Sequence, residues 1–257
     1  MGKLLTAEQV AAFDRDGFVL PVQVLPPEEA ARLLSAYEDY ERRYWGYNDR
    51  AFDDDAGREF LRQPQRQARW AYDLVTHPGV LDGVEDLLGP DIMVWESKLF
   101  VKPPHSESIV TWHQDGTYVG LDPVEKTLTA WIALTGSGPE NGCMRYVPGS
   151  HKWGQLSHAP ANVGANLLQF GQAIERSLDS EPVVDAILQP GEMTIHHSRV
   201  VHGSLPNISD RKRVGLSVFL VTPDVVESHD RRAAILARGV DRYGRFQRFE
   251  WPRGVPA

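Results

Sequence analysis

TWHQDGTYVG, residues 111–120, lies among strand-like segments and carries polar residues that a core strand has no structural need for. Side chains two positions apart on an extended strand point to the same face. His113 and Asp115 have this spacing, so the sequence predicts an imidazole and a carboxylate that point together into the protein. Such a pair is also typical of a hydrogen-bonded core pair or of a surface feature, so a second signal is needed elsewhere in the chain.

Short β-rich segments alternate with turn residues from Asp91 onward, as expected for strands. Helices do not regularly separate them, which favours a mainly β fold with flanking helices over a parallel α/β sheet. The core is expected to be a jelly roll, that is, a cupin-like double-stranded β-helix, or a barrel. The segments are IMVWESKLFV (92–101), IVTWHQD (109–115), TLTAWIALT (127–135), CMRYVPG (143–149), EMTIHHS (192–198), VVHGSL (200–205) and RVGLSVFLVT (213–222).

The first third of the chain has the pattern of helices. Residues 6–16 and 26–45 carry apolar residues at helical spacing, and a further helix is expected at about 77–88. Thr6, followed by a glutamine three positions later, predicts a capping box at the first helix. One more helix is expected at 161–178, as an insertion between strands.

The 257 residues are expected to form a single domain, with a helical part at about 1–90, a jelly-roll core at about 91–223 and a tail at 224–257. A chain of this length buries roughly 70 to 75% of its unfolded surface when it folds as one unit. No internal repeat, low-complexity tract or linker in the sequence indicates a second domain.

Charge and composition narrow the function classes. The net charge is −8 with dispersed basic residues, which argues against nucleic-acid binding. No apolar run approaches the length of a membrane span, so a cytoplasmic protein is expected. The single cysteine, Cys143, excludes an internal disulfide framework and a cysteine-rich zinc site. A bound metal would therefore need histidine and carboxylate ligands.

A second histidine strengthens the signal at residues 111–120. His202 follows His113 by 89 positions at the end of another apolar segment, and Arg213 follows His202 by 11. Two histidines and one carboxylate on a β scaffold form the set that holds Fe(II) and leaves about three coordination positions open. His196 has the same strand parity as His202 and is an alternative ligand. His202 is preferred because an arginine, Arg213, follows it by 11 positions.

The last β segment predicts an anion site. Alternation places Arg213, Gly215, Ser217 and Phe219 on one face of this strand. A guanidinium beside small residues leaves room for a carboxylate, which it can bind through two parallel hydrogen bonds. A 2-oxo acid held in this way could occupy two iron positions and leave the third to O2. The alternative is an arginine at a strand end that pairs with a structural acid.

Several motifs, in this order, resemble the phytanoyl-CoA dioxygenase family of non-haem Fe(II)/2-oxoglutarate oxygenases. They span most of the chain: DGFVL, WHQDGTYVG, TLTAWIALT, ENGCMRYVPGSH and GEMTIHHSRVVHGSLPNISDRKRVGLSV. The resemblance implies that iron is held by His113, Asp115 and His202. It also implies that Arg213 binds the distal carboxylate of 2-oxoglutarate.

Three further residues match positions that line the co-substrate pocket in the family, namely Gln114, Trp131 and Ser204. Each has an ordinary alternative: a solvated strand residue for Gln114, a core aromatic for Trp131 and a turn hydroxyl for Ser204. Lys98 and Lys102 could add positive charge nearby, but exposed lysines are the default expectation.

The resemblance also implies the reaction. A dioxygenase of this type releases succinate and CO2, and the reaction expected here is hydroxylation of a small-molecule metabolite or natural-product intermediate. Halogenases of the superfamily replace the carboxylate ligand, whereas Asp115 is present here, so hydroxylation is favoured over halogenation. Desaturation, epoxidation and ring formation use the same cofactors and stay open. So do a metal enzyme that uses no 2-oxo acid and a catalytically silent binding protein of the same fold.

The remaining histidines and the cysteine have simpler expected places. His105 and His158 could border a substrate cavity, and His151 is expected to brace a loop. His77 is expected at a helix start, His229 at the surface and Cys143 in the core. The oligomeric state, the substrate and the position of oxidation are not indicated by the sequence.

Overall fold

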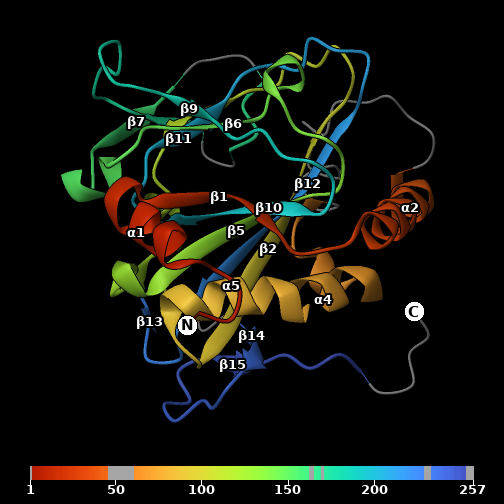
Figure 1. The fold of residues 1–257 in the computed structure, drawn as a ribbon, viewed down its shortest axis with the longest axis vertical. Helices are drawn as coiled ribbons and strands as arrows, with labels where there is room; N and C mark the ends of the chain where they lie inside the picture. Colours follow the sequence, from red (N-terminus) through yellow and green to blue (C-terminus); the bar gives the residue numbers. More distant parts are fainter. Residues whose placement is uncertain (1, 46–60, 162–164, 169–170, 229–232, 253–257) are drawn as a thin grey trace.

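The computed structural model describes residues 2–45, 61–161, 165–168, 171–228 and 233–252. It contains a seven-stranded sheet and a four-stranded sheet that face each other, with helices against the outer side of the larger sheet (Figure 1). This is the double-sheet, cupin-like jelly roll with flanking helices that the sequence predicts. Among the described residues, no helix has the length and apolar character needed to cross a membrane.

The larger sheet has the strand order β1-β10-β5-β12-β2-β14-β15, and the smaller has the order β3-β11-β6-β9. In the larger sheet the bounds are β1 Phe18–Gln23, β2 Ile92–Lys102, β5 Thr127–Ala133, β10 Glu192–His197, β12 Arg213–Val221, β14 Ala233–Arg238 and β15 Gln247–Arg248. In the smaller sheet they are β3 Val110–His113, β6 Met144–Tyr146, β9 Val184–Asp185 and β11 His202–Ser204. Two small pairs complete the strands, β4 Leu121–Asp122 with β13 Val226–Glu227 and β7 His158–Pro160 with β8 Gln172–Ile174.

The expected helices in the first third of the chain are present. The helices are α1 Ala7–Asp16, α2 Pro27–Trp45, α4 Arg69–Val75, α5 Pro78–Leu88 and α6 Gly116–Val119, with 3-10 turns η1 Pro64–Arg66, η2 Val124–Lys126, η3 Pro139–Asn141 and η4 Ser150–Trp153. Thr6 and Gln9 form the predicted capping box at α1. Gly17 follows this helix with a φ of 86°, a left-handed conformation that glycine adopts without steric cost.

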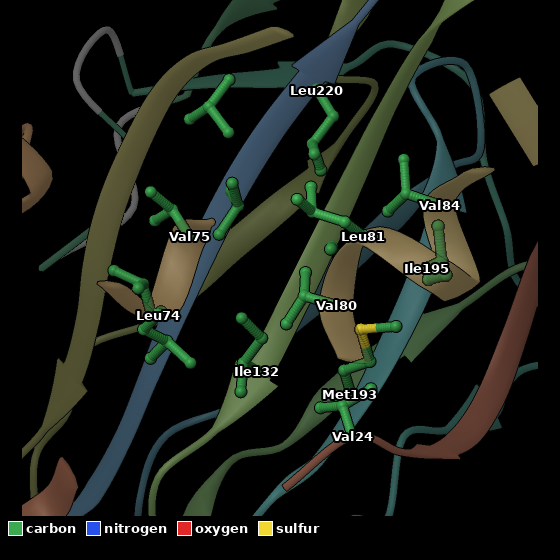
Figure 2. Packing of buried hydrophobic residues seen from close by; sticks show 14 of the residues in the cluster. Val24, Leu74, Val75, Val80, Leu81, Val84, Ile132, Met193, Ile195 and Leu220 are labelled. Carbon is green, nitrogen blue, oxygen red and sulfur yellow. The ribbon is translucent and has the colours of Figure 1, made fainter. Parts of the chain in front are cut away.

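The main core lies between the helices and the outer face of the larger sheet. Figure 2 shows Val80 and Leu81 of α5 packed towards Ile132 of β5 and Ile195 of β10. The β12 residues on this face are the apolar set predicted from alternation: Val214, Leu216, Val218 and Leu220. Because α4 and α5 cover this face, its strand residues can be continuously apolar.

The opposite face of the larger sheet is polar and looks towards the smaller sheet. Since successive side chains alternate between faces, Arg213 and Ser217 share this side with Thr129 and Trp131 of β5. These residues are buried. A sandwich filled only for stability would place apolar residues here, so the space between the sheets is the natural place to look for a site.

The prediction of a helix at 161–178 is wrong. In the described part of this range Gln172–Ile174 forms β8, which pairs antiparallel with β7 through His158↔Ile174 and Pro160↔Gln172. Gly171 precedes the strand with a φ of 55°, which no right-handed helix contains. The apolar spacing that suggested a helix is therefore overridden by pairing with a strand more distant in the chain.

Candidate metal and co-substrate site

Two strands of the smaller sheet place the two histidines opposite each other. His202 of β11 is the register partner of His113 of β3, and their ring centroids lie 4.1 Å apart. The spacing argument placed Asp115 on the same strand as His113. This placement is wrong, because β3 ends at His113. Asp115 instead precedes α6 with helical φ and ψ angles of −57° and −36°, and this turn brings its carboxylate to the histidines.

One ligand atom from each of these three buried residues lies within 4.8 Å of the other two, so the set could hold a metal ion. The Nε2 of His113 is 3.4 Å from Asp115 Oδ1, and the Nε2 of His202 is 3.7 Å from the same oxygen. Ligands that are each about 2.1 Å from a shared ion lie roughly 3 Å apart when their bonds meet at right angles. The two nitrogen–oxygen distances are close to this value, which suits a divalent transition metal.

Backbone carbonyls fix the orientation of both imidazoles. His113 Nδ1 lies 2.9 Å from the carbonyl oxygen of Thr111, and His202 Nδ1 lies 3.1 Å from that of Val200. A carbonyl can only accept a hydrogen bond, so Nδ1 carries the proton in each ring. The Nε2 lone pair of each histidine then faces Asp115, as metal ligation requires.

The two oxygens of Asp115 have different partners. Oδ1 faces the histidines, whereas Oδ2 accepts hydrogen bonds from Thr129 Oγ1 at 2.8 Å and from His196 Nε2 at 3.1 Å. His196, the alternative ligand, therefore contacts the carboxylate from behind and is not part of the three-residue set. Its Nδ1 accepts a hydrogen bond from the Tyr146 hydroxyl at 2.9 Å.

Sequence reasoning did not identify Thr129 or Tyr146. Thr129 is two positions from Trp131 and therefore on the same strand face, which was the available signal. Tyr146 gave no local signal, because its contact with His196 joins β6 to β10 across the two sheets.

Burial and neighbouring charges set the protonation states of Asp115 and His202. Burial acts to raise the pKa of Asp115, but the positive charge of His202 and His113 when these rings are protonated, together with the hydrogen bond that His196 donates, outweighs it and holds this pKa well below its usual value. Burial, followed by the nearby His113, lowers the pKa of His202 well below its usual value. An ionised carboxylate beside a neutral imidazole is the protonation state that binds a metal.

Arg213 is buried on the same polar face and is only 1% exposed. Its Nη1 donates to the carbonyl of Gly142, and its guanidinium lies 5.3 Å from the centroid of the Trp131 ring. Its Nε has no hydrogen-bond partner. Within the described residues no carboxylate contacts it, so the alternative of an arginine paired with a structural acid is not observed there.

Lys102 differs from the sequence expectation of an exposed lysine. It is 0% exposed, and its Nζ donates to Ser204 Oγ at 2.7 Å and to the carbonyl of Leu205. Burial, followed by the repulsion of Arg213, lowers the pKa of Lys102 to about 6. Lys98 is half-buried and donates to the carbonyl of Leu167 at 2.9 Å.

Gln114 is 0% exposed, so it is not the solvated strand residue considered as its alternative. Its amide nitrogen donates to the carbonyls of Gly154 and Arg199, at 2.9 and 2.7 Å. Its oxygen accepts from Leu156 N at 2.7 Å and from Gln155 Nε2 at 3.1 Å. All four hydrogen-bonding positions of the amide are used within the protein.

The other histidines lie outside the three-residue set. His158 Nε2 accepts from the backbone nitrogen of Gln114 at 3.1 Å, close to the site. His105 is exposed and lies 2.8 Å from Asp210. His77 caps the start of α5, as predicted, and Cys143 is buried and free. His151 lies beside His197 at a centroid distance of 5.6 Å, and His229 is outside the described residues.

A jelly roll that buries two histidines and one carboxylate between its sheets has the ligand set of non-haem Fe(II) oxygenases. The sequence profile of the family described as "Phytanoyl-CoA dioxygenase (PhyH)" matches residues 13–215. The chain belongs to this family.

Individual relatives agree with this assignment. A protein of Caenorhabditis elegans named "Probable phytanoyl-CoA dioxygenase" is 25% identical over 242 residues, which cover 87% of this chain and 78% of that protein. A protein of Stutzerimonas stutzeri, named "Probable alpha-ketoglutarate-dependent hypophosphite dioxygenase", is 35% identical over 156 residues. That match covers 59% of this chain and 52% of the relative, so the chain spans about half the length of this relative.

Solved structures share the fold over nearly the whole chain. The non-heme monooxygenase ThoJ, in its apo form, superposes with a TM-score of 0.83 at 34% identity, and the match covers 95% of this chain and 88% of ThoJ. SnoK, described as a non-heme alpha ketoglutarate dependent carbocyclase from nogalamycin biosynthesis, gives a TM-score of 0.67 at 27% identity. That match covers 87% of this chain and 86% of SnoK.

Proposed function

We propose that this protein hydroxylates a small-molecule metabolite or natural-product intermediate, with Fe(II) held by His113, Asp115 and His202. The observation that carries the proposal is the buried three-residue set, with its carbonyl-oriented imidazoles and an Asp115 oxygen that faces both of them. When bound, iron and 2-oxoglutarate supply an oxidant from O2, with conversion of 2-oxoglutarate to succinate and CO2.

Arg213 is the proposed partner of the distal carboxylate of 2-oxoglutarate. A buried guanidinium without an acidic partner is unfavourable unless an anion joins it, because burying an unpaired charge costs several kcal/mol. Trp131 lies against the guanidinium, and Ser204 follows His202 by two positions on β11. We assign both to the wall of the co-substrate pocket. Gln114 is assigned a supporting role, since its amide holds the loops around the site.

Residues around the proposed iron site orient its ligands. Thr129 and His196 hold Asp115 Oδ2, so that Oδ1 faces the two imidazoles. The rings of Tyr118 and His113 pack in a T-shaped arrangement at a centroid distance of 5.7 Å, and we assign Tyr118 to the wall that excludes water from this side of the site. Exclusion of water protects a reactive site from side reactions.

The presence of Asp115 supports hydroxylation over halogenation, since a carboxylate occupies the position that a halide would need. The similarity to ThoJ, described as a monooxygenase, supports the same choice.

The single, buried and unpaired Cys143 supports a reducing, cytoplasmic location.

Ring formation is the second candidate reaction. The observation that favours it is the similarity to SnoK, which is described as a carbocyclase. A ring closure between two carbons of one substrate removes two hydrogen atoms, whereas hydroxylation adds one oxygen atom. The mass of the product therefore distinguishes the two.

Purified protein supplied with Fe(II), ascorbate and 2-oxoglutarate tests the proposal against metabolite extracts. We expect one extract component to gain the mass of one oxygen atom, with dependence on both iron and 2-oxoglutarate and with matching succinate formation. Asp115→Ala is expected to abolish the product, whereas His105→Ala, an exposed histidine outside the set, retains it. Product formation by Asp115→Ala at the wild-type rate would contradict the ligand assignment.

A further inference from the structure

Two basic side chains are buried side by side on the polar face of the larger sheet. Lys102 of β2 is the antiparallel register partner of Arg213 of β12. Side chains directly opposite on neighbouring strands point to the same face, with Cβ atoms about 5 Å apart. The exposed fractions are 0% for Lys102 and 1% for Arg213. Like charges in this arrangement destabilise a sheet.

Both side chains donate hydrogen bonds to neutral acceptors. Lys102 donates to the Ser204 hydroxyl and the Leu205 carbonyl, and Arg213 donates to the Gly142 carbonyl. Within the described residues no carboxylate contacts either group. The thiolate form of Cys143 would favour the protonated form of Lys102, but burial raises the pKa of this thiol to about 11, which leaves it neutral near pH 7. The empty site therefore holds a charged Arg213 beside a Lys102 whose pKa is lowered to about 6, and an anion bound between them would favour the protonated form of Lys102.

Both head groups approach the same backbone position. A Cβ placed on Gly142 would lie 3.0 Å from Lys102 Nζ, and the carbonyl of Gly142 accepts from Arg213. Ser204, which accepts from Lys102, is separated from the ligand His202 by one residue on β11. Lys102 thus connects the side chain of Arg213 with the strand that carries an iron ligand.

We propose that Lys102 is a second cation of the co-substrate pocket, which binds the distal carboxylate of 2-oxoglutarate together with Arg213. The proposal rests on the function proposed above, in which Arg213 is the first such cation. A carboxylate offers about four acceptor sites, enough for the two donors of a guanidinium and a third bond from an ammonium group. An arriving carboxylate takes the place of the Leu205 carbonyl as the partner of Lys102.

This arrangement makes Lys102 a specificity residue for a dicarboxylate. Arg213 alone neutralises one carboxylate, whereas the pair also compensates the cost of bringing the carboxylate into a buried site. A 2-oxo acid that ends in a methyl group would leave both cations unpaired. Lys102 therefore selects 2-oxoglutarate against monocarboxylic 2-oxo acids that chelate iron equally well.

The test is anaerobic binding of 2-oxo acids to the Fe(II)-loaded full chain, followed by the visible absorbance of the iron–2-oxo acid chelate. We expect Lys102→Met to weaken 2-oxoglutarate binding by about ten- to a hundredfold, the usual cost of losing a hydrogen bond to a charged group. Binding of 2-oxopentanoate, which has the same length but no distal carboxylate, should change less than about twofold on the same reasoning. Lys212→Met is the matched control, because Lys212 adjoins Arg213 in sequence and pairs with Glu41.

Lys102→Gln serves as a second variant that keeps hydrogen-bond donors if Lys102→Met does not fold. The proposal is overturned if either folded variant binds 2-oxoglutarate as tightly as the wild type, or loses affinity for both 2-oxo acids equally. An Arg213→Met variant separates this outcome from a failure of the proposed function. If wild-type protein with Fe(II) binds neither 2-oxo acid, or if Arg213→Met binds 2-oxoglutarate normally, the co-substrate assignment itself is wrong.

Discussion

Asp115 uses its two oxygens for different purposes, and this division explains why a single carboxylate can serve as an oriented metal ligand. Oδ2 is held by Thr129 and His196, so the carboxylate cannot rotate freely, and Oδ1 stays directed at His113 and His202. Groups that orient a metal ligand in this way commonly change metal affinity by 10- to 100-fold when they are removed.

Thr129→Val tests this positioning role, because valine keeps the shape of threonine and removes only the hydroxyl. We expect Fe(II) or Mn(II) to bind about 10- to 100-fold more weakly, since Asp115 loses one of its two orienting hydrogen bonds. Thr129→Ser restores the hydroxyl and should restore most of the affinity. Metal titration by calorimetry under anaerobic conditions measures both. Equal affinities of the valine and serine variants would contradict the role of the hydroxyl.

Lys102 gives the metal-free protein a specific pH dependence. Burial, with Arg213 adding to it, lowers the folded-state pKa of Lys102 from the ordinary 10.5 to about 6. Between these pH values the unfolded chain binds more protons than the folded chain, so stability rises with pH across this window and is lowest below about pH 6. The slope from one such group is at most about 1.4 kcal/mol per pH unit.

Urea unfolding of wild type and Lys102→Met at pH 7, 8 and 9 measures this effect without metal or 2-oxoglutarate. We expect the free energy of unfolding of the wild type, minus that of Lys102→Met, to increase as the pH rises, by up to about 1.4 kcal/mol per pH unit. Parallel pH profiles for the two proteins would show that Lys102 keeps its proton in the folded state.

The residue-level predictions from sequence differ in how local their signals are. His113, Asp115 and His202 share one buried set, and their spacing and motifs are visible in the sequence. The burial of Lys102 was not foreseen, because an isolated lysine is usually exposed. Its place opposite Arg213 depends on the register of β2 and β12, two strands distant in sequence.

At the scale of elements, β5 and β12 fit together closely where they carry the co-substrate residues. Gly215 of β12 is the register partner of Ala133, and a Cβ on Gly215 would lie 1.9 Å from the Trp131 ring. Glycine at this position lets the indole approach the backbone of β12 closely, beside Arg213. The close approach therefore sets where the guanidinium can point.

Gly215→Ala should displace Trp131 and with it Arg213. We expect a loss of about 1 to 3 kcal/mol in the free energy of unfolding, as is usual for overpacking in a buried site, and weaker 2-oxoglutarate binding. Gly136→Ala is the matched control, since a Cβ there meets nothing within 4 Å. Chemical denaturation and anaerobic co-substrate titration measure the two effects. Unchanged binding in a folded Gly215→Ala protein would show that Trp131 does not position Arg213.

The long strands of the core were predicted from sequence, whereas β14 and β15 lie in the range expected as a tail, 224–257, and the helix predicted at 161–178 was wrong. Alternation within β12 correctly separated the polar face of Arg213 from the apolar face, because this pattern has a period of two over nine residues. The range 161–178 carries apolar residues at a spacing that also fits a helix. Its described part instead pairs β8 with β7, and Thr111 Oγ1 donates to the carbonyl of Gln172 at 2.6 Å. Such contacts with a distant segment leave no local trace in a short sequence window.

On the scale of the whole molecule, the site joins the two sheets. His113 and His202 belong to the smaller sheet, whereas Thr129 and His196, which hold Asp115, belong to the larger one. The main hydrophobic cluster extends from Leu5 near the start of the chain to Ile235 in β14. This continuity supports the proposal that residues 1–257 act as a single domain, and it implies that occupation of the site stabilises the whole fold.

Metal and 2-oxoglutarate binding should therefore raise the unfolding temperature of the entire protein in one transition. A ligand at 100 times its dissociation constant stabilises the folded state by about 2.7 kcal/mol, which corresponds to roughly 5 to 10 °C for a chain of this size. We use Mn(II) for this scan because it fits the same ligands and resists oxidation. Asp115→Ala should lose the increase, since one of the three ligands is absent.

Ile208→Ala, at a 73% exposed position that is not one of the three ligands, should keep the full increase. Excess EDTA should remove it from every variant that shows it. An equal increase in Asp115→Ala would mean that the metal binds elsewhere. Two separate transitions, of which only one responds to Mn(II), would mean that the sheets unfold independently and that the site does not couple them.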